Sequence, residues 1–213
     1  MDKYLEQISD GKLYELNDMA KVGCHNCEGC HDCCTGMGDT ILLDPYDVYR
    51  LSRGLGKTVE ELMQGHIELH MEEGLILPNL KMTESTKECT FLNKEGRCSI
   101  HEYRPGICRL FPLGRNYEKE HVNYFILKDE CPARGKTKVK VSKWLSQENI
   151  KEYQKYLVDW HNLTKAMRNE ILSSDDETYK KQTSMLFLQL FFMKPYTSDD
   201  FYSEYYLRQD MII

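Results

Sequence analysis

The sequence predicts a mainly α-helical fold with a small β-hairpin and short strands, arranged as an irregular cysteine-rich core with helices at its C-terminal end. Two observations lead to this expectation. All nine cysteines lie before residue 142. After that point the apolar residues recur every three or four positions, which is the period of an amphipathic helix. Hydrophobic residues make up 41% of the 213 residues, enough for a packed core.

Helix-start signals mark the first part of the chain. Residues 1–20 have a weak apolar side and predict a leading helix. Asp44 and Pro45 predict the start of another, because aspartate caps a helix and proline fits its first turn. Thr58 and Glu61 have the spacing of a capping box and predict a third. We interpret the second and third helices as scaffold.

Strand signals are fewer. The segment 93–96, Asn-Lys-Glu-Gly, predicts a tight hairpin turn between short apolar runs. Residues 122–127 are rich in aromatic and β-branched side chains and predict a strand. The basic stretch 136–143 is interpreted as a solvated strand edge rather than a nucleic-acid patch.

The last third of the chain predicts a helical extension. We expect three helices, from Ser146 to about Ile171, over 177–193 ending before Pro195, and over 199–208. The expected domains are therefore a cysteine-cluster domain, 1–142, and a C-terminal extension packed on it, 143–213. The aromatic residues of the tail are interpreted as helix core, and as a surface for a protein partner if they are exposed: Phe187, Phe191, Phe192, Tyr202, Tyr205 and Tyr206.

The charge and hydropathy patterns exclude several classes of protein. The formal net charge is −6, which argues against a nucleic-acid-binding surface. The most apolar stretch, 185–193, is far shorter than the roughly 20 residues needed to span a bilayer. No secretory signal is visible at the N-terminus, so we expect a cytoplasmic protein. In that reducing compartment, clustered cysteines favour metal or redox chemistry over structural disulfides.

Five of the cysteines fall within eleven residues, 24–34. Cys24, Cys27, Cys30 and Cys33 recur at every third position, a step that would spread four thiols around a helix but suits a loop wrapped around a metal. The intervening His, Asn, Glu and Asp residues make this run too polar to be a core element. Because adjacent side chains diverge, Cys33 and Cys34 are expected to serve different ions, or different irons of one cluster.

The spacing slightly favours iron–sulfur over zinc. The run Cys27-x2-Cys30-x2-Cys33 resembles the opening of a ferredoxin-type ligand set, and Cys131 is followed by a proline, as its remote fourth ligand often is. Zinc would accept a C-x2-C pair with a second tight pair downstream, but the later cysteines are dispersed. Without Cys24, eight thiols remain, enough for two sites of four.

Two other kinds of side chain accompany the cysteines. His25, His31 and His101 are more simply interpreted as solvated, or as hydrogen-bonded to a sulfur, than as ligands. Arg104 and Arg109 would either offset the negative charge of a thiolate site or pair with surface carboxylates.

Taken together, these motifs resemble the CxxCxxCC cysteine-cluster family of zinc- or iron-chelating domains. The resemblance covers residues 24–132, through Cys27-x2-Cys30-x2-Cys33-Cys34, the stretch from Arg104 to Pro112, and the positions of the remaining cysteines. It implies metal chelation by eight residues: Cys27, Cys30, Cys33, Cys34, Cys89, Cys98, Cys108 and Cys131. Cys24 lies outside the family pattern.

Three functions remain open at this point. The first is chelation of iron, as an iron–sulfur cluster, or of zinc. The second is an iron–sulfur-dependent enzyme, because the family includes flagellin lysine N-methylases; the chain, however, has no glycine-rich nucleotide loop that would support methyl transfer. The third is thiol–disulfide exchange, which the Cys27/Cys30 spacing fits but the crowd of other thiols does not.

Overall fold

A computed structural model describes residues 3–24 and 30–212. Helices alternate with short antiparallel strands, so the fold is more mixed than the mainly α fold with one hairpin that the sequence predicts. The helices are α1 (Lys3–Ile8), α2 (Pro45–Leu55), α3 (Val59–Met63), α4 (Gly106–Leu110), α5 (Val141–Leu145), α6 (Ile150–Ser173), α7 (Glu177–Leu188) and α8 (Phe201–Gln209), with shorter turns η2 (Asp32–Cys34) and η3 (His101–Tyr103) and a π-helical turn η4 (Gln189–Met193).

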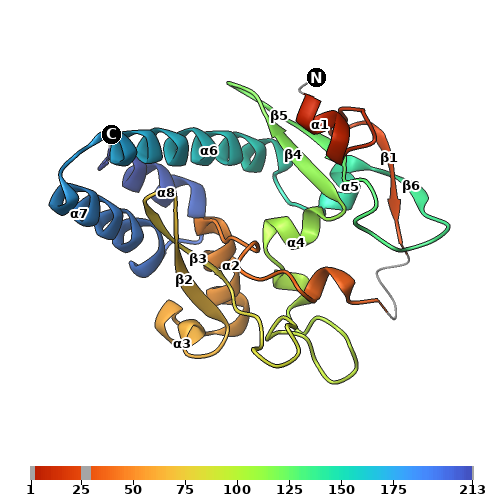
Figure 1. The fold of residues 1–213 in the computed structure, drawn as a ribbon, viewed down its shortest axis with the longest axis horizontal. Coiled ribbons are helices and arrows are strands. Elements are labelled where there is room, and N and C mark those ends of the chain that lie inside the picture. The colour runs from red at the N-terminus through yellow and green to blue at the C-terminus, as the bar shows by residue number, and fades with distance from the viewer. Residues whose placement is uncertain (1–2, 25–29, 213) are drawn as a thin grey trace.

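The described strands form three separate antiparallel pairs. Strand β1 (Met19–Gly23) pairs with β6 (Thr137–Lys140), so two segments more than a hundred residues apart in sequence lie side by side. Strands β2 (Ile67–Glu72) and β3 (Leu75–Leu80) form one hairpin, and β4 (Leu113–Tyr117) and β5 (Val122–Ile126) form another. Figure 1 shows the first and third pairs on one side of the molecule and the β2–β3 hairpin on the other.

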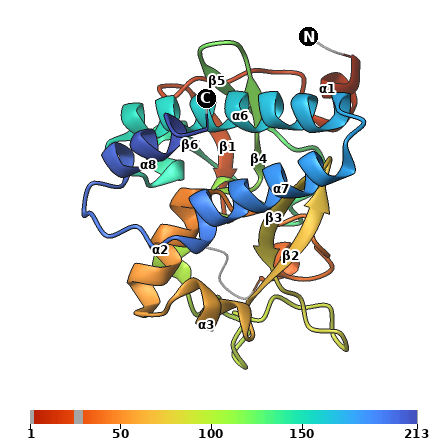
Figure 2. The ribbon, with the colours of Figure 1, turned by 90° about the vertical axis from the view of Figure 1, so that its left-hand side faces the viewer.

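The long helix α6 crosses the top of the molecule, with α7 and α8 beside it (Figures 1 and 2). Its buried face carries Tyr153, Leu157, Met167 and Ile171, as the helical spacing predicts. The main core joins this face to α2, α3, the β2–β3 hairpin, α7 and α8. The core therefore draws on residues from both sides of the boundary predicted at residue 142, and that boundary stays a prediction.

The tail aromatics confirm their interpretation as core. Of the six, four are at most 2% exposed, and only Tyr202 and Tyr206 stay partly accessible; the buried four are Phe187, Phe191, Phe192 and Tyr205. The helix over 177–193 is confirmed as α7 continued by η4, ending before Pro195. No helix in the described ranges is long and apolar enough to cross a membrane.

The predicted caps are also confirmed. Asp44 caps α2, accepting from the backbone N–H of Asp47, and Asp47 accepts in return from the N–H of Asp44. Thr58 and Glu61 close the same reciprocal box on α3.

The leading helix over 1–20 is wrong beyond Ile8. The following residues pair with distant strands instead: Tyr14 bridges Tyr124, and β1 pairs with β6. Buried strand pairing outweighs a weak helical pattern, because unpaired backbone groups are costly to bury. The turn over 93–96 is confirmed, since Asn93 and Arg97 are hydrogen-bonded across it and Gly96 has a φ of +69°.

Candidate metal centre

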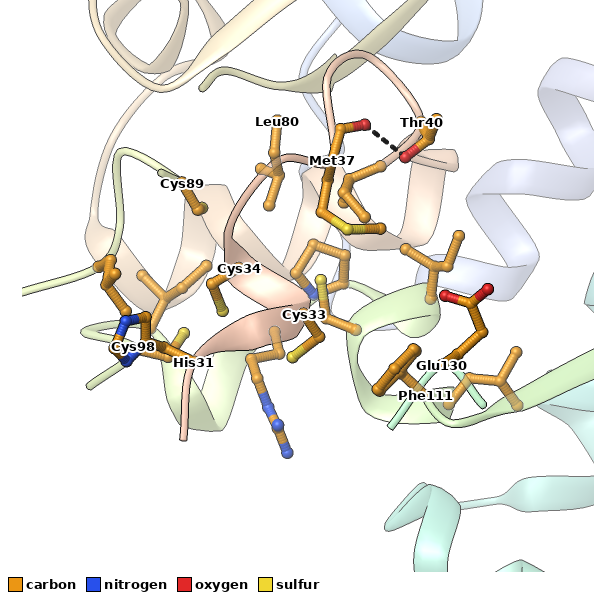
Figure 3. Close-up of a pocket in the computed structure, with 18 of the residues that line it drawn as sticks. His31, Cys33, Cys34, Met37, Thr40, Leu80, Cys89, Cys98, Phe111 and Glu130 are labelled. Carbon is orange, nitrogen blue, oxygen red and sulfur yellow. Dashed lines mark hydrogen bonds between the residues drawn. The ribbon is translucent and has the colours of Figure 1, made fainter. Parts of the chain in front are cut away.

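Cysteine side chains from three parts of the chain line one cavity of about 410 Å³. Six of the eight predicted ligands lie there: Cys30, Cys33, Cys34, Cys89, Cys98 and Cys108. Figure 3 shows Cys33 and Cys34 on the turn η2, with Cys89 and Cys98 on the neighbouring loops. The rest of the wall is largely apolar and includes Met37, Leu80 and Phe111, residues that the sequence did not single out.

Backbone pairing brings these thiols together. The N–H of Cys89 donates to the carbonyl of Cys34 at 2.7 Å, and the N–H of Gly36 donates to the carbonyl of Lys87 at 2.7 Å. These two bonds fasten the end of η2 to the segment before Cys89. The 93–96 turn then returns the chain so that Leu92 bridges Cys98. These backbone contacts alone therefore bring Cys34, Cys89 and Cys98 close together.

Cys108 reaches the cavity from the short helix α4, which the buried carboxylate of Asp47 holds in place. Asp47 is 2% exposed and accepts from the N–H of Gly106 at 2.6 Å. Burial, and next the negative charge of Asp44, raise the pKa of Asp47 to about 7. Buried Arg109 offsets part of this negative charge. The aspartate thus links the start of α2 to the helix that carries a thiol.

The thiols interact electrostatically with one another. The pKa of Cys33 is raised, first by its hydrogen bond with the Cys34 thiol and then by burial. Burial raises the pKa of Cys108 strongly, and the neighbouring charges of Asp47 and Cys89 raise it further. Like charges so close disfavour ionisation of the whole set. A bound cation reverses that balance, because metal coordination requires and stabilises thiolates.

Some groups around the cavity already favour thiolates. Burial raises the pKa of Cys89 and of Cys98. A backbone hydrogen bond to each sulfur, from Phe91 to Cys89 and from Ile100 to Cys98, lowers that pKa in part. The positive charge of Arg104 lowers the pKa of both Cys33 and Cys98. Backbone N–H groups and cations directed at sulfur are the outer partners that metal–thiolate sites use.

The two arginines therefore have different roles. Arg104 lies at the cavity and offsets thiolate charge, one of the two roles that the sequence left open. Arg109 is 7% exposed and turns away, toward Gln147 and over the ring of Tyr153 at 5.5 Å. It fits neither predicted role, because its charge balances buried Asp47 instead of a thiolate or a surface carboxylate.

His31 and His101 also line the cavity. Burial lowers the pKa of His101, and the charge of Arg104 lowers it further, which keeps the imidazole neutral. Both imidazole rings therefore share one cavity wall with the thiols. His25 lies outside the described residues, as does Cys27.

Cys131 lies elsewhere. It lines a second, smaller cavity of about 160 Å³ together with Cys24, Cys30, Asp32 and Cys33. Of the predicted ligands that the structure describes, Cys131 alone is absent from the wall of the larger cavity. The two cavities adjoin at Cys30 and Cys33, which contribute to both walls.

The donor set fits zinc or iron, both of which thiolates bind. Within 3–24 and 30–212, no three His, Cys, Asp or Glu side chains converge closely enough to hold an ion as they stand. Coordination would therefore require the thiols to turn inward, and the ordering of these loops would be coupled to binding.

Comparison with known proteins agrees with this chemistry. The family model CxxCxxCC, described as a "putative zinc- or iron-chelating domain", matches residues 26–132. That range includes all the predicted ligands and begins after Cys24. No curated protein and no solved structure matches the chain.

Proposed function

The chain belongs to the CxxCxxCC family of zinc- or iron-chelating domains, and from this premise we propose that it holds its metal through the thiolates of Cys27, Cys30, Cys33, Cys34, Cys89, Cys98, Cys108 and Cys131. One observation carries the proposal: thiols that are up to 78 residues apart in sequence, from Cys30 to Cys108, line a single cavity. Isolated cysteines are often plain buried hydrophobes. Six gathered at one cavity, with Arg104 beside them, are better explained as ligands.

Iron, bound as an iron–sulfur cluster, is slightly favoured over zinc. The support is the C-x2-C-x2-C run with a remote Cys-Pro, a ligand order typical of ferredoxin-type clusters. The shared cavity of Cys30, Cys33 and Cys131 agrees with that order. Zinc is the close alternative, because four thiolates also satisfy its tetrahedral preference. Nothing in the described residues favours the methylase-like alternative, and we do not propose it.

The test is to purify the protein without oxygen and measure its metals, acid-labile sulfide and visible spectrum. Brown protein with iron and sulfide would establish a cluster. Colourless protein with stoichiometric zinc would establish the zinc form and reject the cluster. If neither metal is present and all nine thiols react freely with an alkylating reagent, chelation itself is refuted.

A further inference from the structure

Cys24 stands outside the match to the family model, which begins at residue 26. It directly follows strand β1, whose last residue, Gly23, is paired with Thr137 of β6. This pairing places the end of β1 beside the segment that leads from Cys131 into β6. Residues 24 and 131 thereby share the wall of the smaller cavity, although they are more than a hundred positions apart in sequence.

The eight described cysteines divide between the two cavities without remainder. Six line one cavity alone: Cys34, Cys89, Cys98 and Cys108 line only the larger cavity, and Cys24 and Cys131 line only the smaller one. Cys30 and Cys33 line both. If these two complete the smaller set, each cavity has four thiols, the number that a tetrahedral thiolate site requires.

A cationic side chain lies beside each set. Arg104 lies at the larger cavity, where its charge acts on the Cys98 thiol and also on the Cys33 thiol that the two cavities share. At the smaller one, the ammonium group of Lys136 donates to the carbonyl of Cys131 at 2.7 Å. Four thiolates around a divalent ion leave a net charge of about −2, so a nearby cation stabilises each site.

We propose that Cys24, Cys30, Cys33 and Cys131 form a second metal site, distinct from a first site made by Cys34, Cys89, Cys98 and Cys108, and that Cys24 is a ligand. This inference rests on the proposed chelating function and changes one ligand in it: Cys24 takes the position given there to Cys27, which lies outside the described residues. The two sites adjoin at the turn η2, where Cys33 lines both cavities and Cys34 lines the larger one alone. Their hydrogen-bonded thiols make the sites direct neighbours.

The inference is tested by adding Zn²⁺ alone to metal-stripped, full-length protein and counting bound ions by native mass spectrometry. The wild type is expected to bind two ions, and Cys24→Ser one. Cys89→Ser is the matched control, expected to bind one ion at the other site. Alkylation mapping should therefore find the larger-cavity thiols protected in Cys24→Ser and the smaller-cavity thiols protected in Cys89→Ser.

A measurement on the wild type guards against a variant that fails to fold. Cys24 is expected to resist alkylation when zinc is bound and to react once a chelator removes it. Equal reactivity of Cys24 in both states, with the other thiols protected by zinc, would overturn this inference and leave the proposed function intact. Two ions retained by folded Cys24→Ser would do the same. Absence of any bound zinc and of any thiol protection would overturn the proposed function itself.

Discussion

The carboxylate of Asp47 is the clearest place to test how the thiol cavity is fastened to the helical core. It accepts from the N–H of Gly106 at 2.6 Å and from the N–H of Asp44 at 3.3 Å, and it is almost fully buried. Above its pKa of about 7 the carboxylate is charged, and hydrogen bonds to charged groups contribute about 1.5–3 kcal/mol each. Removing the Asp47 carboxylate also removes its repulsion with Asp44, which offsets part of the stability lost with the two hydrogen bonds. We therefore expect Asp47→Ala to lower the free energy of unfolding by about 3 kcal/mol, near the low end of the sum.

For a chain of this length, about 3 kcal/mol corresponds to a fall in Tm of about 6–12 °C. Urea and thermal unfolding followed by circular dichroism measure both quantities on metal-loaded protein. Asp199→Ala is the matched control, because Asp199 is paired with Arg53 at the surface and its side chain is 92% exposed. An exposed pair contributes at most about 1 kcal/mol. If both variants lose the same small amount, the link between α2 and α4 is not the support that we infer.

Three further predictions concern the same region. Hydrogen-exchange mass spectrometry should show that a chelator increases amide exchange over the thiol-bearing segments 30–36 and 87–110 more than in α6–α8; a uniform increase would contradict this. Arg104→Ala should raise the pKa values of Cys33 and Cys98 in metal-free protein, and Arg104→Lys should raise them less, measured as the pH dependence of alkylation. Because the pKa of Asp47 is raised in the folded state, its contribution to stability is present below about pH 4 and is lost as the pH rises through about 7. Wild-type stability should therefore fall relative to that of Asp47→Asn between about pH 4 and pH 7 and level off above pH 7; a constant difference would show that the carboxyl does not titrate there.

Local signals in the sequence predicted the helices well. The capping boxes at Asp44 and Thr58 depend on residues three positions apart, so the sequence contains all the information they need. The same holds for α6, whose apolar spacing predicts its buried face. The β2–β3 hairpin was missed although a signal exists: 67–72 alternates apolar and polar residues and leads into Gly74, whose φ is +87°.

The remaining errors involve partners that are far apart in sequence. The predicted helix over 1–20 ran into the start of strand β1, whose partner, β6, lies more than a hundred residues away. The buried role of Arg109 depends on Asp47, Gln147 and Tyr153, which come from separate helices or loops. The family resemblance named the eight candidate cysteines, but spacing could not show how the cysteines divide between two cavities, because that depends on contacts between segments that are far apart in sequence.

The distribution of regular structure suggests what the metal adds to this fold. The long helices bury aromatic and aliphatic side chains in the main core and have extensive packing of their own. The thiol-bearing segments contain only short turns and the five-residue helix α4, joined by isolated bridges such as Thr35–Glu88 and Leu92–Cys98. Such segments have little regular secondary structure of their own, and repulsion between the thiolates opposes their assembly. Metal coordination would stabilise the thiol-bearing segments, so removal of metal should loosen these segments before the helical core.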